Sequence, residues 1–534
     1  MIATEIAILS ALILATRCAN YPDVLVAGNV YFTDADCYAR MTRVRMCARH
    51  PGTIVRHHDF ENFPQGTSPH TTAPFDYLIL GLSTLLKPFT AHPVDLAGAL
   101  ISPLLALFGG WFLWWWSRRM RFRFRWALLI LYGISPILVH GSELGRPDHQ
   151  SLSIWLVTMA LCAEWALRSE GNNAGDTPLS AAMAIQRWSI VSGIAWGLAL
   201  WVSAYEALLL LALVLACHAV DARRRVIDWW QDRQSLLARN RRVGWILFGA
   251  IVLLAAVIER RIPSISILHS NEIFTNWART IGELASVSPT DPIWFRWAGW
   301  LLIAAPFLIW FSTRKKQSPP IFIVFLLIAT YVFTIWQTRW AYFFVSIFAI
   351  ALPSLLELIK LRTVVWAAFI LSIFPILRDW DDRIWPTDAE LARRLEHRHE
   401  AIELRASAST MMSSETRPFL APWWLSPSIA YWSGQPGVGG SSHESLPGIA
   451  DSARFFLATD QEQARKILEN RHVSWVVAYD ADRVTQNSAA ILGAPVPARP
   501  LAQILDRTPA QAPGFLTLTD QNGVDKVFRV ENKR

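Results

Sequence analysis

Apolar segments of about the length needed to cross a membrane recur along this chain as far as residue 378 and then stop. A helix that crosses the hydrocarbon core needs about 20 mostly apolar residues, and somewhat fewer where its ends reach toward the interface. Of the 534 residues, 53% are hydrophobic and 17% are charged, which is too apolar for a soluble protein of this length. The sequence therefore predicts a polytopic α-helical membrane protein.

We expect about eleven spans in this part of the chain. They cover residues 2–17, 95–116, 126–141, 151–168, 188–203, 205–220, 243–258, 294–312, 320–337, 340–357 and 362–378. The apolar segment from Phe75 to Leu86 is short and follows a long polar loop. We therefore expect it to form a helix that lies on, or dips into, the outer leaflet.

The net charge of +8 is concentrated in short loops between the predicted spans. These basic loops cover residues 118–125, 223–242 and 314–316, with Lys360 and Arg362 in a fourth loop. The positive-inside rule places all four in the cytoplasm, which puts the N-terminus inside. Because the charge is explained by membrane topology, a nucleic-acid partner is not expected.

With this topology the outer face of an inner (cytoplasmic) membrane receives a long first loop 18–94, a second loop 259–293 and everything after residue 378. Residues 379–534 change character: 385–406 and 461–470 read as charged helices, 473–479 as an apolar strand and 434–448 as a loop. The sequence thus predicts a transmembrane domain 1–378 and a small periplasmic α/β domain 379–534.

Cysteine usage gives no sign of a metal site. The five cysteines show no Cys-x-x-Cys pair and no pairing with histidine at zinc-finger spacing. Cys37 and Cys47 could form a disulfide in an oxidising compartment or could remain free thiols.

Acidic residues stand next to a membrane boundary in three of the predicted outer segments. They are Asp34 and Asp36 after the first span, Asp148 in the turn Gly145-Arg146-Pro147-Asp148-His149-Gln150, and Glu283 in Thr280-Ile281-Gly282-Glu283. Carboxylates at such a surface can hold a divalent cation, which prefers hard oxygen ligands. Taken singly, each has a plainer interpretation: a solvated acidic loop at Asp34 and Asp36, a helix cap at Asp148 and a hydrogen-bonded bystander at His149.

A fourth predicted outer turn carries Arg339, between two spans. A guanidinium at the bilayer boundary suits a phosphate because it can donate two parallel hydrogen bonds, although it can equally serve as an interface anchor. Carboxylates that converge with an arginine on one membrane face point to a metal and a phosphorylated, membrane-embedded donor.

At these positions the chain resembles the catalytic subunit of oligosaccharyltransferase, of the single-subunit bacterial or archaeal kind, which has the GT-C fold. The matching motifs are Asp36-Cys37-Tyr38, Gly145-Arg146-Pro147-Asp148, Thr280-Ile281-Gly282-Glu283, Arg339 and Trp423-Trp424. Thr280-Ile281-Gly282-Glu283 is the most specific, because it reproduces the family's Thr-Ile-x-Glu motif.

The chain departs from the family pattern at two positions. The second acidic motif usually has an acid or a histidine two residues after its aspartate, where this chain has Gln150. The family's Trp-Trp-Asp-Tyr-Gly motif reads Trp423-Trp424-Leu425-Ser426-Pro427 here, without the aspartate that helps to hold the acceptor's hydroxyl.

The resemblance implies a metal-dependent, inverting transfer of a glycan from a polyprenyl diphosphate to a protein acceptor, at an asparagine. Asp36, Asp148 and Glu283 would hold Mg²⁺ or Mn²⁺, with Asp36 and Glu283 also orienting the acceptor amide. Arg339 would bind the diphosphate, and Trp423 and Trp424 the acceptor. Asp34, His149, Gln150 and Thr280 would support these side chains.

Two other functions remain open at this stage. A transferase of the same fold could use a polyprenyl-monophosphate sugar and a lipid or hydroxyl acceptor, but it would not need a Thr-Ile-x-Glu motif. A secondary transporter should bury polar residues or Gly and Pro breaks near the membrane midplane. The predicted spans contain few charged residues, which disfavours a transporter.

Overall fold

The computed structural model describes residues 2–172, 178–224, 239–260, 272–312 and 319–531. Two of the predicted cytoplasmic loops, 223–242 and 314–316, lie largely or wholly outside the described residues. The chain forms two compact units, each assembled from separate stretches of sequence. The first unit contains Met1–Tyr21, Leu100–Ile265 and Ser286–Pro386, and the second contains Pro22–Ala99, Ser266–Ala285 and Thr387–Arg534.

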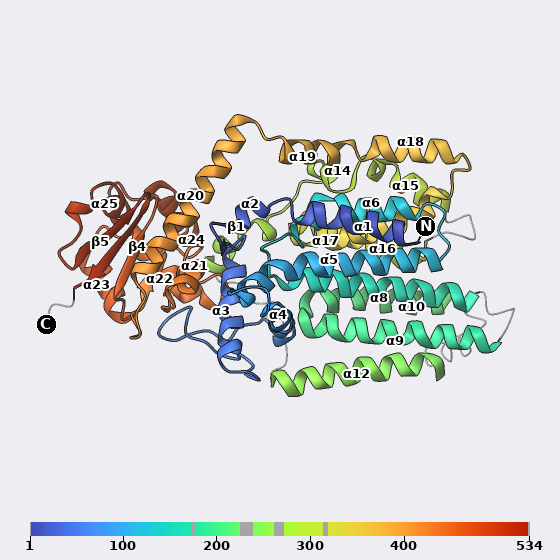
Figure 1. Cartoon of the computed structure of the whole chain (residues 1–534), viewed down its shortest axis with the longest axis horizontal. Helices are drawn as coiled ribbons and strands as arrows, with labels where there is room; N and C mark the ends of the chain where they lie inside the picture. The colour runs from blue at the N-terminus through green and yellow to red at the C-terminus, as the bar shows by residue number, and fades with distance from the viewer. Residues whose placement is uncertain (1, 173–177, 225–238, 261–271, 313–318, 532–534) are drawn as a thin grey trace. The chain divides into compact units, whose positions relative to one another are not determined.

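The first unit is a bundle of helices, and its long helices run along approximately one direction (Figure 1). Its helices are α1 (Ile2–Arg17), α5 (Pro93–Arg119, from Leu100 onward), α6 (Arg125–Ile134), α7 (Pro136–His140), α8 (His149–Asn172), α9 (Pro178–Val202), α10 (Ala204–Arg224), α12 (Arg239–Glu259), α14 (Ile293–Ala298), α15 (Leu301–Ser312), α16 (Ile321–Trp336), η2 (Thr338–Trp340), α17 (Ala341–Leu356), α18 (Arg362–Ser372) and α19 (Phe374–Ile384).

Each predicted span coincides with one of these helices or with a pair of consecutive short ones. Among the described residues, four helices are long and apolar enough to cross a membrane unaided: Pro93–Arg119, His149–Ser169, Arg241–Glu259 and Thr338–Leu356. The pair α18 and α19, bent by 44°, would make a fifth. Other predicted spans are shorter apolar helices, such as Ala204–Val220 and Ile321–Trp336.

Burial differs strongly between the helices of this bundle. Every residue of α17 is buried, so this helix forms the bundle's core. Apolar side chains of α12 and α15 are instead exposed, among them Leu253, Val257, Phe307 and Trp310. Exposed apolar surface on such helices is what a lipid environment requires.

The break between α14 and α15 lies against the break between α18 and α19. Gly299 ends α14 with a φ of +79°, and a Cβ there would lie 2.7 Å from the Ser372 carbonyl oxygen at the end of α18. Ser372 accepts a hydrogen bond from the Trp300 amide on this carbonyl (2.9 Å) and one from the Leu301 amide on its hydroxyl oxygen (2.6 Å). The backbone groups freed by one break are therefore satisfied by the other, as an apolar environment demands.

The second unit contains a small α/β fold. Its elements are α2 (Tyr21–Val24), β1 (Leu25–Val26), β2 (Asn29–Val30), α3 (Ala35–Arg49), α4 (Ala73–Leu86), α13 (Glu272–Ala278), η1 (Gly282–Leu284), α20 (Asp388–Thr410), β3 (Phe419–Leu420), α21 (Ser426–Ser433), η3 (His443–Ser445), α22 (Leu446–Leu457), α23 (Gln461–Asn470), β4 (Trp475–Ala478), α24 (Ala481–Leu492), α25 (Leu501–Arg507), η4 (Pro509–Gln511), β5 (Leu516–Asn522) and β6 (Asp525–Val530).

A four-stranded sheet in the order β3-β4-β6-β5 forms the centre of this fold. β4 pairs parallel with β3 and antiparallel with β6, and β5 pairs antiparallel with β6. Val476, Val477 and Phe528, none of which is exposed, join the sheet to the helices packed on it. The predicted strand, the two charged helices and the separate helix from about Phe75 to Leu86 are all present, as β4, α20, α23 and α4.

The two predicted outer loops contribute most of the remaining residues of this unit. The segment 58–70, between α3 and α4, lies against the C-terminal fold through backbone hydrogen bonds. The Phe63 amide donates to the Gly437 carbonyl oxygen (3.1 Å), and the Gly437 amide donates to the Phe60 carbonyl oxygen (2.9 Å). The Arg471 guanidinium donates to the Phe63 carbonyl oxygen at 3.2 Å.

Cys37 and Cys47 are free thiols, both buried in α3. Ten residues along one helix correspond to roughly 15 Å, which is too far for a disulfide. The free-thiol alternative is therefore the correct one.

Candidate functional site

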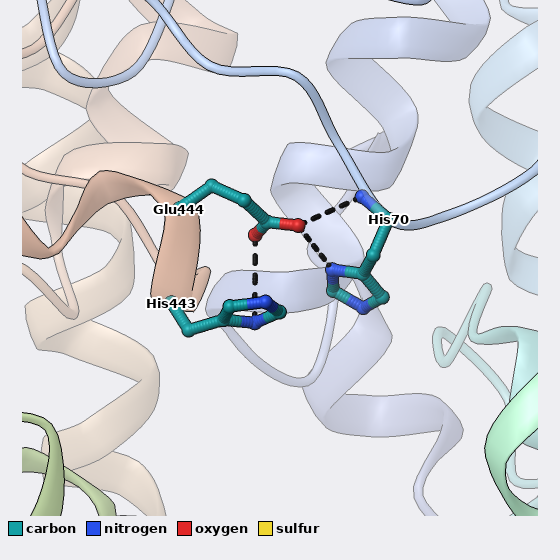
Figure 2. Close-up of side chains that lie close together, drawn as sticks. All are labelled: His70, His443 and Glu444. Carbon is teal, nitrogen blue, oxygen red and sulfur yellow. Dashed lines mark hydrogen bonds and ion pairs between the residues drawn. The ribbon is translucent and has the colours of Figure 1, made fainter. Parts of the chain in front are cut away.

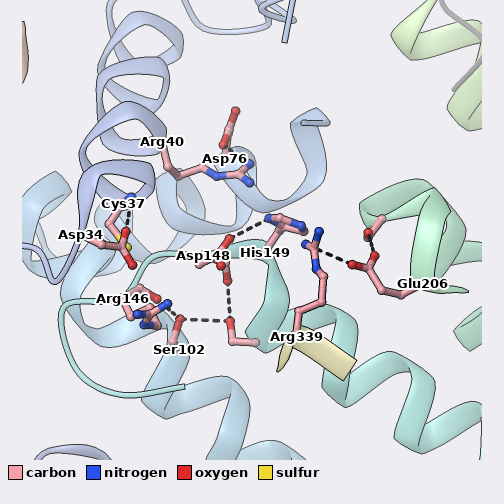
Figure 3. Close-up of polar contacts among 12 residues, drawn as sticks. Asp34, Cys37, Arg40, Asp76, Ser102, Arg146, Asp148, His149, Glu206 and Arg339 are labelled. Carbon is pink, nitrogen blue, oxygen red and sulfur yellow. Dashed lines mark hydrogen bonds and ion pairs between the residues drawn. The ribbon is translucent and has the colours of Figure 1, made fainter. Parts of the chain in front are cut away.

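Arg339 lies in the short η2 helix between α16 and α17. Its Nη2 forms an ion pair with Glu206 Oε1 at 3.1 Å. Glu206 is buried in the first turn of α10 and also accepts a hydrogen bond from the Ser203 hydroxyl (Figure 3). Glu206, itself held by Ser203, thus orients the guanidinium.

A small cavity of about 10 Å³, roughly the space that one water molecule needs, adjoins this ion pair. It is lined by His149, Gln150, Ser153, Ile154, Ser203, Glu206, Arg339, Tyr342 and Phe343. We call it the Arg339 pocket. Three residues singled out in the sequence, His149, Gln150 and Arg339, therefore meet at one place within the first unit.

Asp148 stands directly before α8, as expected of a residue at a helix start. Its Oδ1 lies 2.7 Å from His149 Nδ1, and its carbonyl oxygen accepts a hydrogen bond from the Ser151 hydroxyl at 2.9 Å (Figure 3). His149 therefore connects the Asp148 carboxylate to the Arg339 pocket.

A series of buried, hydrogen-bonded side chains supports one wall of the pocket. Arg146 Nη2 lies 3.0 Å from His140 Nε2, and His140 Nδ1 lies 2.8 Å from the Tyr342 hydroxyl. Arginine only donates, so His140 Nε2 must accept and the ring proton sits on Nδ1, where it is donated to Tyr342. Tyr342, which lines the pocket, is thereby held in one orientation.

Asp34 and Asp36 lie at the start of α3 in the second unit. Asp34 caps this helix, because its carboxylate accepts a hydrogen bond from the Cys37 amide at 2.9 Å. Asp36 falls in the first turn and is exposed.

Buried charges fix the rest of α3. Arg40 Nη1 lies 3.0 Å from Asp76 Oδ1 on α4, and Arg43 Nε lies 3.6 Å from Asp76 Oδ2 (Figure 3). All three side chains are less than a tenth exposed. Separating these buried side chains would leave a charge without compensation. The contacts therefore fix α3, which carries Asp36, against α4.

Glu283 lies in η1, one short turn after α13. The Thr280 hydroxyl donates to the Trp277 carbonyl oxygen at 2.7 Å, which closes the turn before Glu283. Trp277 packs edge-on against Trp423, with ring centroids 5.8 Å apart and an interplanar angle of 70°. The Glu283 segment is therefore anchored beside the tryptophan pair.

The tryptophan pair is fixed on its other side as well. Trp423 Nε1 donates to Asn487 Oδ1 at 2.9 Å, and the Trp424 ring centroid lies 6.1 Å from that of Trp423. Leu425 packs against both apolar cores of this domain. The Ser426 hydroxyl is buried and donates to the Pro422 carbonyl oxygen at 3.1 Å, so it is committed to the backbone.

The predicted metal ligands are divided between the two units. Asp148 belongs to the first unit with His149, Gln150 and Arg339, whereas Asp36 and Glu283 belong to the second with Asp34, Thr280, Trp423 and Trp424. A joint metal site of Asp36, Asp148 and Glu283 stays a prediction.

Sequence reasoning missed several polar residues of these regions: Glu206, Tyr342 and His140 in the first unit, and Glu61, His70, His443 and Glu444 in the second. Glu61 is almost fully buried and accepts hydrogen bonds from the Ser441 amide (3.2 Å) and the Ser442 hydroxyl (3.4 Å). Burial raises the pKa of Glu61 to about 7. Each of the seven also contacts a residue that is remote in sequence, so no local motif marks them.

Comparison with known proteins gives matches to solved structures only. No family model and no curated protein matches the chain. It is similar to an oligosaccharyltransferase of Archaeoglobus fulgidus tethered with an acceptor peptide containing the NVT sequon, with 14% identity and a TM-score of 0.66. The match covers 92% of this chain and 70% of that one.

Two further matches were solved with lipid phosphates. One is AglB of Archaeoglobus fulgidus in complex with an inhibitory peptide and a dolichol-phosphate, with 16% identity, a TM-score of 0.65 and coverage of 92% of this chain and 70% of that one. The other is ArnT of Cupriavidus metallidurans bound to undecaprenyl phosphate, with 12% identity, a TM-score of 0.58 and coverage of 98% and 96%.

At these identities the likeness concerns the fold, which confirms the polytopic helical architecture with a small C-terminal α/β domain that the sequence predicts. The chain has the GT-C fold of the membrane glycosyltransferases AglB and ArnT.

Proposed function

We propose that this protein is a membrane glycosyltransferase that moves a glycan from a polyprenyl-diphosphate donor to an asparagine of a protein acceptor, at the outer face of the membrane. The observation that carries the proposal is the Arg339 pocket, in a chain with the GT-C fold. Neighbours with this fold were solved with dolichol-phosphate and with undecaprenyl phosphate.

The Arg339 guanidinium at this pocket suits the phosphate end of a lipid-linked donor. The guanidinium fork can donate parallel hydrogen bonds to phosphate oxygens, and the ion pair with Glu206 fixes its direction beforehand. Ile154 and Phe343 give the pocket apolar walls. Such a wall lowers the local dielectric and strengthens the attraction between the arginine and a phosphate.

Asp36, Asp148 and Glu283 are the side chains we assign to Mg²⁺ or Mn²⁺. Three carboxylates are a donor set that these cations prefer, and the exposed Asp36 at the start of α3 is accessible to one. A further Archaeoglobus oligosaccharyltransferase structure, with 15% identity and a TM-score of 0.61, was solved in complex with Zn and sulfate. A divalent cation supplies charge neutralisation to the departing diphosphate.

Asp36 and Glu283 would also bind the acceptor. An amide nitrogen is a poor nucleophile because its lone pair is delocalised, and carboxylates that accept both of its N–H groups orient it for attack opposite the leaving group. Attack from that side inverts the anomeric centre. The contact of Trp277 with Trp423 supports this role, since it anchors the Glu283 segment beside the predicted acceptor-binding pair.

The enzyme should discriminate only weakly between acceptor peptides that have and that lack a hydroxyl side chain two residues after the asparagine. Leu425 cannot accept a hydrogen bond, and the Ser426 hydroxyl is buried against the Pro422 carbonyl oxygen. A site that lacks the hydroxyl's partner discriminates weakly against acceptors without it. We therefore expect peptides with Asn-x-Thr and Asn-x-Ala to react at rates within about tenfold of each other, since one such hydrogen bond is worth about 1 kcal/mol.

A second candidate is a transferase that uses a polyprenyl-monophosphate sugar and a lipid or hydroxyl acceptor. The departure at Leu425 and the match to ArnT over 96% of its length favour it. The Thr280-Ile281-Gly282-Glu283 segment, which this reaction does not need, favours the first candidate.

The test offers purified protein in detergent either a polyprenyl-diphosphate glycan or a polyprenyl-monophosphate sugar, each with an asparagine peptide or a lipid acceptor. Mass spectrometry then identifies the product. We expect glycopeptide from the diphosphate donor. Product from the monophosphate donor and the lipid alone would establish the second candidate and reject the first.

A further inference from the structure

Two histidines and a glutamate gather in the second unit, apart from the residues assigned to the proposed reaction. His70 belongs to the segment between α3 and α4, whereas His443 and Glu444 belong to η3, just before α22 (Figure 2). One ligand atom from each lies within 4.8 Å of the others. Among the described residues, no other group of three His, Cys, Asp or Glu side chains is this compact.

Glu444 is the centre of the group. Its Oε1 lies 2.8 Å from His70 Nδ1 and accepts a hydrogen bond from the His70 amide at 2.8 Å. Its Oε2 lies 3.5 Å from His443 Nδ1. The carboxylate is 17% exposed, against 53% for the His70 side chain and 40% for His443, so the group is reached from solvent on the histidine side.

We propose that His70, His443 and Glu444 form a binding site for one Zn²⁺ ion or a similar divalent transition metal. Two imidazole nitrogens and one carboxylate oxygen make a donor set that zinc favours, and the exposed side of the group leaves room for water as a fourth ligand. Mg²⁺ prefers a set made of oxygens alone, so this site would be distinct in kind from the carboxylate set of Asp36, Asp148 and Glu283.

The site would fasten the segment 58–70 to the C-terminal fold. That segment is already held there by Glu61, which accepts hydrogen bonds from the Ser441 amide and the Ser442 hydroxyl immediately before His443. A metal shared by His70 and His443 would close the same contact about ten residues further along the loop. Because the residues it joins are remote in sequence, its binding free energy would stabilise the folded second unit.

A hydrogen-bonded cluster without metal is the competing explanation, since one carboxylate can serve two imidazoles. The metal site and the metal-free cluster predict different results when zinc is added. The full-length protein in detergent is stripped with a chelator, placed in excess Mg²⁺ to occupy carboxylate sites, and titrated with ZnCl₂. Binding is followed by isothermal calorimetry and stability by the shift of Tm.

The variants are His70→Ala, His443→Ala and Glu444→Gln, with His92→Ala as the matched control, because His92 is an exposed histidine of the same unit. We expect one equivalent of zinc to bind to the wild type and to His92→Ala and to raise Tm. In each of the three ligand variants zinc binding should weaken by at least about 100-fold, the upper end of what loss of a supporting partner costs. His70 is more than half exposed, so its replacement should not prevent folding.

Co²⁺ gives a second readout. Bound by two imidazoles and a carboxylate, it should show visible d–d absorption in the wild type that is absent from His443→Ala and present in Asp36→Asn. Equal zinc affinity in wild type and ligand variants, or no zinc binding by the wild type, would overturn the site. Because these readouts do not use transferase activity, the site and the proposed function can fail separately.

Discussion

The guanidinium of Arg339 is positioned by a side chain from another helix. Glu206 pairs with it at 3.1 Å, and the Ser203 hydroxyl in turn donates to Glu206. The sequence marks Arg339 because a cation at a predicted membrane boundary is unusual. It does not mark Glu206, because an acidic residue in the first turn of an apolar helix also fits a helix N-terminus.

Replacing Arg339 should separate the effects of charge and shape. Arg339→Ala should lower kcat/KM for the lipid-linked donor by about 10²–10³-fold, the loss typical of a preorganised charge contact, and Arg339→Lys by less because a point charge remains. Steady-state kinetics with varied donor, in protein matched for Tm, measures both. Equal kinetics for wild type and Arg339→Ala would reduce Arg339 to an interface anchor.

Asp525 is the most isolated buried carboxyl group of the C-terminal fold. It is fully buried at the start of β6, and neither carboxyl oxygen has a hydrogen-bond partner among the described residues. Burial, with the nearby Glu403 and Glu400, raises its pKa to about 8. The folded protein therefore keeps a proton on Asp525 that the unfolded chain releases near pH 4.

This proton makes stability fall with rising pH. Between about pH 4 and pH 8 the folded state binds more protons than the unfolded state, so the free energy of unfolding decreases as pH rises through this range. Asp525→Asn removes the titration and should give a higher Tm than wild type at pH 8, with a flatter dependence on pH. The exposed Asp482→Asn is the control. Identical Tm curves for Asp525→Asn and wild type from pH 5 to 8 would contradict the prediction.

At the scale of helices and strands, hydropathy predicts where spans lie because lipid imposes a length on apolar segments. It does not predict where spans break. The pairs α14/α15 and α18/α19 read as continuous apolar segments. The contact of Gly299 with Ser372 joins both interruptions, and Pro375 at the start of α19 contributes to the second. The strand β4 could be read from its apolar run, whereas the short β3 depends on pairing with β4 across more than fifty residues.

The contact of α13 with the tryptophan pair gives a prediction at this scale. Trp277 is 3% exposed, and its loss should leave a cavity beneath the Glu283 segment. Trp277→Ala should cost about 3–5 kcal/mol of local stability and lower transfer about tenfold or more, through displacement of Glu283.

A double-mutant comparison separates positioning from general damage. If Trp277 acts through Glu283, the double variant Trp277→Ala/Glu283→Ala should be no slower than Glu283→Ala alone. Trp385→Ala serves as the control, because Trp385 is 77% exposed. Additive losses in the double variant would show that Trp277 does not act by positioning Glu283.

For the whole molecule, the sequence predicts the GT-C fold but not how the site residues are distributed between the two compact units. Asp36 and Glu283, nearly 250 residues apart, fall in one compact unit with the C-terminal fold, while Asp148 and Arg339 fall in the other. Motif spacing along the chain carries no information on this division, because it depends on which loops pack on the C-terminal sheet. The group of His70, His443 and Glu444 is hidden for the same reason.

Membrane orientation is the prediction that concerns the molecule as a whole. Reporter fusions at residue 230 should be cytoplasmic and fusions at residue 450 extracytoplasmic, because this is the assignment that keeps the four basic loops inside. Paired alkaline phosphatase and fluorescent protein fusions measure both positions. An external residue 230 or an internal residue 450 would overturn the topology.

The central claim is metal-dependent glycan transfer at Asp36 and Glu283, and formation of glycopeptide from a polyprenyl-diphosphate glycan and an asparagine peptide tests it most directly. We expect product with Mg²⁺ or Mn²⁺, none in excess EDTA, and rates lower by about 10²–10³-fold in Asp36→Ala and Glu283→Ala, since each removes a charge aimed at the reacting groups. Full activity in EDTA, or in both variants, would contradict the account.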